Sequence, residues 1–248
     1  MAKNLHVGDD VYVPVTRVGL EVNNQSAIFS GKIVAIDGRS IKVTLPSGEY
    51  SKFIPTSAVQ KNIKLLVIKV GDFKTEEILL DPLQKSILQY FRLLLNDDEI
   101  VCESLRSLAE LSVIWKKHHS VISHVIIVGH GSKNTIQFGN DFITPDQLST
   151  EFSIENATPK QFVSLCCKTG YADFGKTFSK FPICDSLIAP FQSIHGAIAS
   201  QFCQTYFAYH LLQGQTVKVA CKHAIKSTPG AVSFRLWKDG KLLAGQKT

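Results

Sequence analysis

The stretch Val125-Ile126-Ile127-Val128-Gly129-His130-Gly131 is an uninterrupted apolar run that ends in a histidine between two glycines. A second run, Phe162-Val163-Ser164-Leu165-Cys166-Cys167, ends in a pair of cysteines. Short apolar runs rich in β-branched residues are typical of strands that are buried on both faces. The two runs therefore predict two core strands, each of which ends at a chemically capable side chain, His130 or Cys167.

The pattern around these runs predicts an α/β fold. From residue 62 onward, apolar strand-like segments alternate with segments of helical periodicity. The expected strands are 64–70, 123–129, 161–166 and 186–190, and the expected helices are 81–94, 104–117, 196–213 and 216–226, followed by a hairpin over 231–240. Asp81-Pro82 is expected to begin the first helix, with Asp81 as its N-cap. Such alternation favours a mostly parallel sheet with helices on both faces, whose ligand site lies beyond the carboxyl ends of the strands.

The first sixty residues have a different character. Short β-patterns near 11–13, 32–36, 40–45 and 50–54 alternate with turn signals, and no helix of usable length is expected. The openings Gly8-Asp9-Asp10-Val11 and Gly31-Lys32-Ile33-Val34 resemble those of SH3-like or Tudor-like barrels. We therefore predict a small all-β barrel over 1–60 and an α/β domain over 61–248. The aromatic side chains Tyr12, Phe29, Tyr50 and Phe53 serve its core or a recognition surface.

Composition excludes several classes of function. The chain has 248 residues, 44% of them hydrophobic, and a net charge of +6. Its basic residues are scattered, so a dedicated nucleic-acid surface is not indicated. No apolar run is long enough for a membrane helix, and no signal peptide is evident after Met1. The six cysteines lack metal-binding spacing, so we expect no metal, no cofactor, no disulfides and a reducing, cytoplasmic location.

A cysteine beside a histidine is the minimum apparatus of a cysteine protease. A neutral thiol is a poor nucleophile, and a nearby imidazole can take its proton. Attack on a peptide carbonyl also needs donors for the developing oxyanion, and the backbone N–H groups of Gly131 and Cys167 are the candidates. The following Lys168-Thr169-Gly170 predicts a sharp turn that would expose a sulfur at its tip.

Structural explanations compete with this interpretation. A buried cysteine or a loop histidine taken alone is more often structural, but two of them at corresponding strand ends favour a shared site. Cys166 is the rival nucleophile, because side chains alternate along a strand and only one of the two thiols can face the cleft. The residues alone leave that choice open. His195 and His210, which flank or lie in the expected long helix, are expected to be structural.

Three segments resemble the CHAT group of caspase-like cysteine peptidases: 128–132 (VGHGS), 163–170 (VSLCCKTG) and 206–220 (YFAYHLLQGQTVKVA). The resemblance covers about 62–230 in the order seen in that family. It implies a caspase–haemoglobinase fold and a catalytic dyad of His130 and Cys167, with Cys166 in the place of a small alanine. It also implies a regulated protease effector of prokaryotic antiphage defence or cell death.

The chain departs from that family in its acidic residues. The loop after 186–190 carries no carboxylate, and Leu165 stands where some basic-specific relatives have an acid. Asp141, Asp173 and Asp185 are the remaining candidates for a specificity pocket, so the cleavage-site preference stays open.

The leading hypothesis is a cysteine endopeptidase that acts on a protein or peptide substrate. A protein partner, sensor or ligand would control its activity, and the barrel would be a docking or regulatory module. Two alternatives remain: a catalytically silent scaffold on the same fold, and a nucleic-acid-tethered adaptor that acts through the barrel. The six basic and five acidic residues of 1–60 are too balanced for strong phosphate binding, which argues against the adaptor.

Overall fold

The computed structural model describes residues 5–20, 27–155 and 157–247. Its centre is a seven-stranded sheet in the order β13-β12-β11-β10-β7-β5-β6. The five strands from β11 to β6 are parallel, and β12 and β13 extend the sheet as an antiparallel hairpin. The strands of this sheet are β5 (Leu65–Lys69), β6 (Ile100–Ser104), β7 (His124–Val128), β10 (Lys160–Ser164), β11 (Cys184–Pro190), β12 (Phe234–Lys238) and β13 (Lys241–Ala244).

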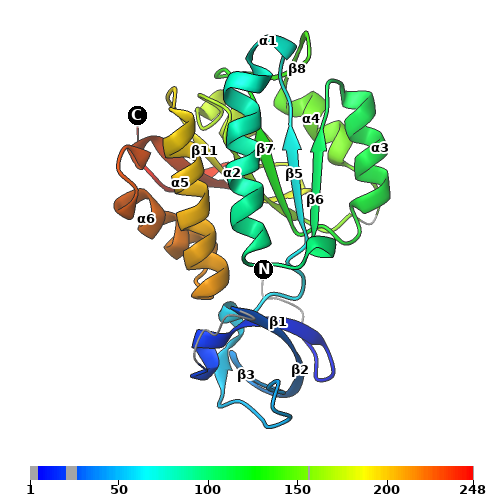
Figure 1. Ribbon diagram of the computed structural model, residues 1–248, viewed down its shortest axis with the longest axis vertical. Helices are drawn as coiled ribbons and strands as arrows, with labels where there is room; N and C mark the ends of the chain where they lie inside the picture. The colour runs from blue at the N-terminus through cyan, green and yellow to red at the C-terminus, as the bar shows by residue number, and fades with distance from the viewer. Residues whose placement is uncertain (1–4, 21–26, 156, 248) are drawn as a thin grey trace.

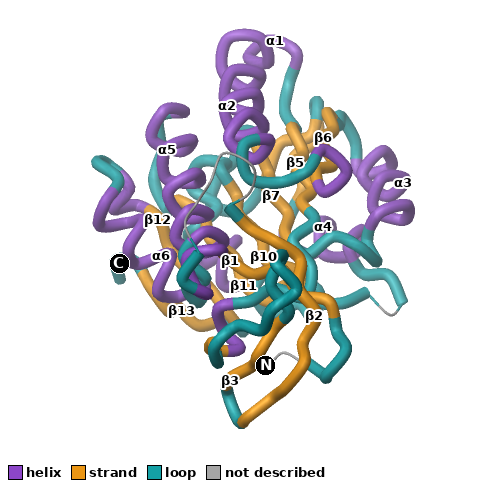
Figure 2. The backbone as a smooth tube through the Cα atoms, turned by 60° about the horizontal axis from the view of Figure 1, so that its bottom comes forward, coloured by secondary structure: helices purple, strands orange, loops and turns teal. Residues whose placement is uncertain are grey.

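Helices cover both faces of this sheet. Figures 1 and 2 show α2, α5 and α6 on one side and α3 and α4 on the other. The α-helices are α1 (Phe73–Thr75), α2 (Asp81–Arg92), α3 (Leu108–His118), α4 (Pro145–Phe152), α5 (Gly196–Phe207) and α6 (Val217–Ser227). Single turns of 3₁₀ or π-helix are η1 (Val15–Val18), η2 (Thr56–Ala58), η3 (Glu76–Leu80), η4 (Asp97–Glu99), η5 (Ala172–Lys176), η6 (Ala208–Leu212) and η7 (Ala231–Ser233). The predicted α/β architecture, with a mostly parallel sheet between two layers of helices, is confirmed.

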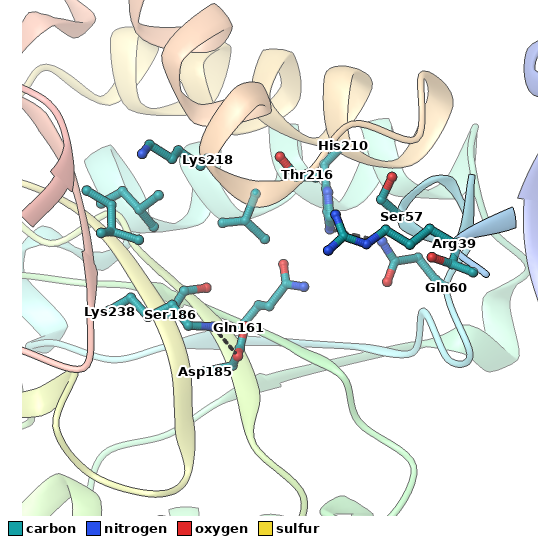
Figure 3. Close-up of a pocket in the computed structure, with 14 residues that line it drawn as sticks. Arg39, Ser57, Gln60, Gln161, Asp185, Ser186, His210, Thr216, Lys218 and Lys238 are labelled. Atoms are coloured by element: carbon teal, nitrogen blue, oxygen red, sulfur yellow. Dashed lines mark hydrogen bonds and ion pairs between the residues drawn. The ribbon is translucent and has the colours of Figure 1, made fainter. Parts of the chain in front are cut away.

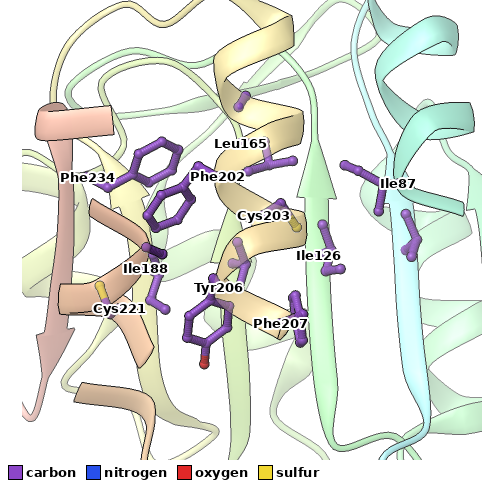
Figure 4. Packing of buried hydrophobic residues seen from close by; sticks show 14 of the residues in the cluster. Ile87, Ile126, Leu165, Ile188, Phe202, Cys203, Tyr206, Phe207, Cys221 and Phe234 are labelled. Carbon is purple, nitrogen blue, oxygen red and sulfur yellow. The ribbon is translucent and has the colours of Figure 1, made fainter. Parts of the chain in front are cut away.

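Two apolar cores lie on the two faces of the sheet, because successive side chains of its strands point to opposite sides. Ile126 and Leu165 face α2 and α5, where they meet Phe202 and Phe207 (Figure 4). Phe162 packs on the opposite face, with side chains of α3, α4 and η5. The near-continuous apolar sequence of the central strands thus reflects burial on both sides.

The N-terminal residues form a four-stranded antiparallel sheet that curls into a half-barrel (Figure 1). Its order is β1-β2-β3-β4, with a separate core that includes Val11, Ile33, Ile41 and Val43. The strands are β1 (Asp10–Pro14), β2 (Ile28–Asp37), β3 (Ser40–Val43) and β4 (Ile54–Pro55). Residues 50–54 were expected to form a strand, but only the short β4 forms there.

The half-barrel packs at the edge of the large sheet where the parallel strands begin (Figure 1). Gln60 continues the barrel by bridging to Tyr12, and its side-chain Nε2 lies 3.3 Å from His210 Nε2 below α5. Thr16 Oγ1 donates to the carbonyl oxygen of Leu212 at 2.9 Å. The barrel therefore lies against the opposite end of the α/β unit from the carboxyl ends of the strands.

Several element predictions need correction. Leu80, not Asp81, is the N-cap residue of α2, because a turn of π-helix (η3) precedes the helix and the Asp81 carboxylate binds Lys69 instead. The expected helix over 196–213 is α5 followed by the π-turn η6. Strand β6, helix α4 and the small hairpin of β8 (Ile136–Phe138) and β9 (Asp141–Ile143) were not predicted from the sequence.

Candidate functional site

The strands β7 and β10 are parallel neighbours at the centre of the large sheet. Ile127 pairs with Ser164, and His130 and Cys167 each follow three residues further along. Because the two strands are parallel and in register, both residues lie at the same level of the carboxyl edge of the sheet. This register places the predicted base and the predicted nucleophile on adjoining turns.

The two turns are in close contact. A Cβ at Gly131 would lie 2.7 Å from the Cys167 carbonyl oxygen and 2.9 Å from Cys166 Cβ. Such distances are far below ordinary van der Waals contact, so only glycine fits at this position. The glycine after His130 therefore brings the backbone of the histidine turn against the cysteine turn.

The turn after β10 holds the Cys167 thiol at its tip. Lys168 adopts φ +65°, which is uncommon for a residue with a side chain and marks a tight reversal of the chain. The Gly170 carbonyl oxygen accepts a hydrogen bond of 2.9 Å from Trp237 Nε1, which fixes the far end of the turn. Cys167 is half-buried, and its Sγ accepts a hydrogen bond of 3.4 Å from the Ile194 N–H.

Cys166 lies in a different environment. Its side chain is fully buried in the core on the α3–α4 face of the sheet, and its Sγ lies 3.8 Å from the Ile127 carbonyl oxygen. Burial raises the pKa of the Cys166 thiol to about 12. A neutral and inaccessible thiol is a poor nucleophile, so the structure favours Cys167 over Cys166 for that role.

A chain of hydrogen bonds orients the His130 imidazole. The Thr75 hydroxyl donates to Asp72 Oδ1 at 2.8 Å, and Thr75 Oγ1 lies 2.5 Å from His130 Nε2. A hydroxyl has one proton to donate, so Thr75 must accept from His130 in this arrangement. His130 Nε2 therefore carries a proton, which leaves Nδ1 as the basic nitrogen of the neutral ring.

Asp72 is the anionic end of this chain. Hydrogen bonds from the Thr75 hydroxyl and backbone N–H lower the pKa of the Asp72 carboxyl, and the charge of a protonated His130 lowers it further. An ionised carboxylate behind a histidine stabilises the imidazolium that forms when the ring takes up a proton. Here the carboxylate acts through a hydroxyl rather than by direct contact.

An ion-pair network holds the segment that carries Asp72 and Thr75. Glu76, in the following turn, binds both Lys69 at the end of β5 and Arg106 just after β6. Lys69 also binds Asp81 at the start of α2. Burial acts to lower the pKa of Lys69, but its two carboxylate partners outweigh burial and raise it. The network therefore connects the segment that carries Asp72 and Thr75 to β5 and β6.

The predicted oxyanion donors are the N–H groups of Gly131 and Cys167. Within the part of the chain that the structure describes, neither amide takes part in a hydrogen bond. The β-bridge between Gly131 and Ile136 is formed by two hydrogen bonds, from the Gln137 N–H to the His130 carbonyl oxygen and from the Ser132 N–H to the Thr135 carbonyl oxygen. The Gly131 N–H takes part in neither bond. Two uncommitted donors on adjoining turns meet the chemical requirement for binding an oxyanion.

A groove of about 650 Å³ lies between η3, α2 and the start of α5, and neither His130 nor Cys167 is among its lining residues. Thr75, the partner of His130, lies in one wall, and His195, the residue after Ile194, lies in the other. The rest of the lining is mostly apolar and comprises Lys74, Ile78, Leu79, Pro82, Leu83, Ser86, Gly196, Ala197 and Ser200.

The other residues considered from sequence lie away from the dyad or have structural roles. His195 caps α5, since its Nδ1 accepts a hydrogen bond of 3.2 Å from the Ala197 N–H. Asp185 is at the start of β11, at the amino edge of the sheet, and pairs with Lys238 at 2.6 Å. It therefore cannot line a pocket at the carboxyl edge. Asp141 and Asp173 are exposed, in β9 and η5 respectively.

Sequence reasoning missed Asp72, Thr75 and Ile194 as parts of the site. Asp72 follows β5 directly after Gly71, at the same carboxyl edge as His130 and Cys167. Functional residues are expected just beyond the carboxyl ends of parallel strands, and this expectation applies to Asp72 as well as to His130 and Cys167. Nothing in the sequence marks Thr75, whose contact with His130 depends on the turn of α1, or Ile194, which contributes only its backbone to the Cys167 sulfur.

The chain matches no protein-family model, and no curated protein matches it. None of the helices among the described residues is both long enough and apolar enough to cross a membrane. Over the same residues, no group of three or more His, Cys, Asp or Glu side chains is arranged to hold a metal ion.

Proposed function

We propose that this protein is a caspase-like cysteine endopeptidase with Cys167 as nucleophile and His130 as general base. The observation that carries the proposal is the Asp72–Thr75–His130 chain of hydrogen bonds, at the sheet edge where the Cys167 turn also lies. A nucleophile, a base and a third group that orients the base form the arrangement that covalent acyl transfer uses.

The proposed reaction proceeds in two steps. His130 Nδ1 takes the Cys167 proton, and the sulfur attacks the peptide carbonyl while the N–H groups of Gly131 and Cys167 stabilise the oxyanion. The imidazolium then protonates the leaving amine, and the C–N bond breaks to give a thioester on Cys167. A water molecule, deprotonated by His130, hydrolyses the thioester and releases the carboxylic acid product.

The apolar groove beside the dyad is the proposed binding site for the substrate chain. Thr75 in one wall contacts His130, and His195 in the other wall follows Ile194, whose N–H donates to Cys167 Sγ; we therefore propose that a peptide positioned for attack extends into the groove. The lining of Ile78, Leu79 and Leu83 suits an aliphatic or aromatic side chain rather than a charged one. We therefore propose that an apolar substrate residue flanks the scissile bond.

Kinship with the CHAT group, and with it the caspase–haemoglobinase fold, belongs to the same proposal. The order of the three sequence segments supports it, as does the arrangement of helices on both sides of a mostly parallel sheet. By the same kinship, we propose that the activity serves prokaryotic defence or regulated cell death and is controlled by a protein partner or ligand.

A peptidyl acyloxymethyl ketone tests this proposal, because the probe requires an active nucleophile and a peptide-binding groove. We expect covalent labelling of the full chain to be abolished by Cys167→Ala and to persist in Cys166→Ala. The Cys166→Ala variant is the matched control, since it removes the neighbouring thiol from the same turn. A probe with an apolar residue next to the reactive group should label faster than one with lysine or aspartate there.

Two results would overturn the assignment. Labelling that is lost in Cys166→Ala and persists in Cys167→Ala would show that Cys167 is not the nucleophile. If every probe leaves Cys167 unlabelled, both alone and with cell extract that supplies possible activators, a catalytically silent scaffold becomes the better account.

A further inference from the structure

A second cavity, of about 550 Å³, lies between the half-barrel and the amino edge of the large sheet (Figure 3). Arg39 and Gln60 enter it from the barrel, and Gln161 and Ser186 enter it from the first residues of β10 and β11. The start of α6 closes it with Thr216 and Val217. It is at the opposite end of the sheet from Cys167 and has no part in the proposed proteolysis.

The cavity has an excess of positive charge. Arg39, Lys218 and Lys238 line it from the barrel, α6 and β12 respectively. Among the described residues, Asp185 is the one carboxylate that lines it, and it pairs with Lys238 at 2.6 Å. Figure 3 shows the Arg39 guanidinium extending from the barrel toward His210. A guanidinium fork is one of the groups that proteins use most often to bind phosphate.

The cavity also has a polar group that lacks a partner. Ser186 is 2% exposed, and among the described residues its hydroxyl has no hydrogen-bond partner. A buried hydroxyl without a partner is costly, so one at the wall of a cavity points to a bound polar group. The apolar side chains of Val217, Leu236 and Leu243 complete the lining and offer a surface for a flat ring.

We propose that this cavity binds a small phosphorylated ligand with an apolar ring, of the size and chemistry of a nucleotide. Its volume is within the range of about 300–1,000 Å³ that is typical of small-molecule sites. The phosphate would lie against Arg39, and the ring would lie against Val217 with the amide of Gln161 and the Ser186 hydroxyl at its edge. Bound in this way, the ligand would join the half-barrel to the α/β unit.

Isothermal titration calorimetry on the full chain tests this inference without any need for peptidase activity. The probes are the four ribonucleoside monophosphates, ATP and GTP, the matching nucleosides, and inorganic phosphate. We expect saturable one-to-one binding of at least one nucleotide, and at least about tenfold weaker binding of its nucleoside, which lacks the charge-assisted hydrogen bonds.

Variants locate the binding site. Arg39→Ala should weaken binding about tenfold, since it removes a charge-assisted contact. Lys52→Ala is the matched control, because Lys52 is an exposed cation of the same N-terminal unit and does not line the cavity. Val217→Trp should fill the cavity and abolish binding while the thermal unfolding temperature stays close to that of the wild type.

Three outcomes would overturn the inference. In the first, no nucleotide binds. In the second, a nucleotide binds equally well to the wild type and to the Arg39→Ala and Val217→Trp variants. In the third, inorganic phosphate binds as tightly as every nucleotide, which would show that the apolar lining contributes nothing. Because the assay measures binding alone, its failure leaves the proposed cysteine chemistry unaffected.

Discussion

Two adjacent cysteines occupy opposite environments in this protein. Cys166 points into a closed core, and burial raises its thiol pKa, while Cys167 is half-buried at the tip of a tight turn. Both cysteines follow the last residue of β10, Ser164, so the turn after the strand, and not alternation within the strand, directs the two thiols into different surroundings. Of these two thiols, only that of Cys167 is therefore placed for the proposed chemistry at this edge of the sheet.

Thr75 is predicted to be a positioning residue for His130. The Thr75→Val variant keeps the side-chain volume but removes the hydroxyl that connects His130 to Asp72, so the imidazole loses its fixed tautomer. We expect labelling of Cys167 by the peptidyl ketone to slow by roughly tenfold or more, because the oriented base is lost.

Rescue by Thr75→Ser distinguishes this role from a purely structural one. Serine retains the hydroxyl and should restore most of the labelling rate, while thermal unfolding temperatures of both variants control for stability. Equal labelling rates in the wild type and Thr75→Val would remove Thr75 from the mechanism.

At this scale the sequence predicts part of the site. Strand ends pointed to His130 and Cys167, and alternation showed that one of the two thiols must face inward. The contact of Thr75 with His130 could not be predicted, because a hydrogen bond between residues 55 positions apart depends on the fold of the short turn that carries Thr75.

The decisive element is the segment from Gly71 to Leu80, between β5 and α2. It carries Asp72 and Thr75, and Glu76 anchors it to Lys69 and Arg106. Lys69 is 5% exposed and the Glu76 side chain 15%, so removing one member of this pair costs more than it does at a surface ion pair. The orientation of the His130 ring therefore depends on the ion pairs of Glu76 with Lys69 and Arg106, which lie outside the proposed dyad.

The Glu76→Gln variant should be less stable than the wild type at neutral pH, by at least about 1 kcal/mol, because it leaves the buried Lys69 and the half-buried Arg106 with fewer anionic partners. The hydrogen bond from Lys69 lowers the pKa of Glu76 below its ordinary value of 4.5. A carboxyl with a lowered folded-state pKa stabilises the fold fully above its ordinary pKa and loses that contribution as the pH falls. Urea unfolding at about pH 7 and about pH 2.5, below the lowered pKa, measures the effect.

The stability difference between the wild type and Glu76→Gln should therefore shrink toward acid pH. Glu77→Gln is the matched control, since Glu77 is exposed in the same turn. A difference that is the same at both pH values would mean that Glu76 does not act through its charge.

Element predictions succeeded where burial is complete and failed where it is partial. Strands β5 and β7 are fully buried, so their sequences are apolar except for Lys69 at the end of β5 and His124 at the start of β7. Strand β6 is at the edge of the sheet with half-exposed side chains, and its mixed sequence gave no strand signal. The π-turns η3 and η6 have no sequence signature that helical periodicity could detect.

The whole molecule places its two candidate sites at opposite ends of one sheet. The proposed dyad follows the carboxyl ends of β7 and β10, and the charged cavity lies where β10 and β11 begin. The half-barrel therefore leaves the dyad uncovered and instead forms one wall of the cavity. A barrel could be predicted from sequence, but its position could not, because it depends on contacts such as that of Gln60 with His210.

We predict that the half-barrel and the α/β unit unfold together. Tyr12 and Ile28 of the barrel pack against the large apolar cluster of the α/β unit, and His210 links the two through hydrogen bonds to Gln60 and the Gln215 carbonyl oxygen. The wild type should show one calorimetric transition. His210→Ala should lower its stability by about 2 kcal/mol, since buried polar groups lose a partner. Two well-separated transitions in the wild type would contradict this prediction.

The most direct test of the account is the rate at which iodoacetamide alkylates each of the six cysteines, followed by peptide mass spectrometry. If His130 activates Cys167, that thiol should react first, and His130→Asn should slow it by at least about tenfold, because the thiolate is the reactive species. His195→Asn is the matched control, as asparagine preserves the cap of α5, and it should leave the rate unchanged. Alkylation of Cys167 at the same rate in the wild type and His130→Asn would contradict the proposed dyad.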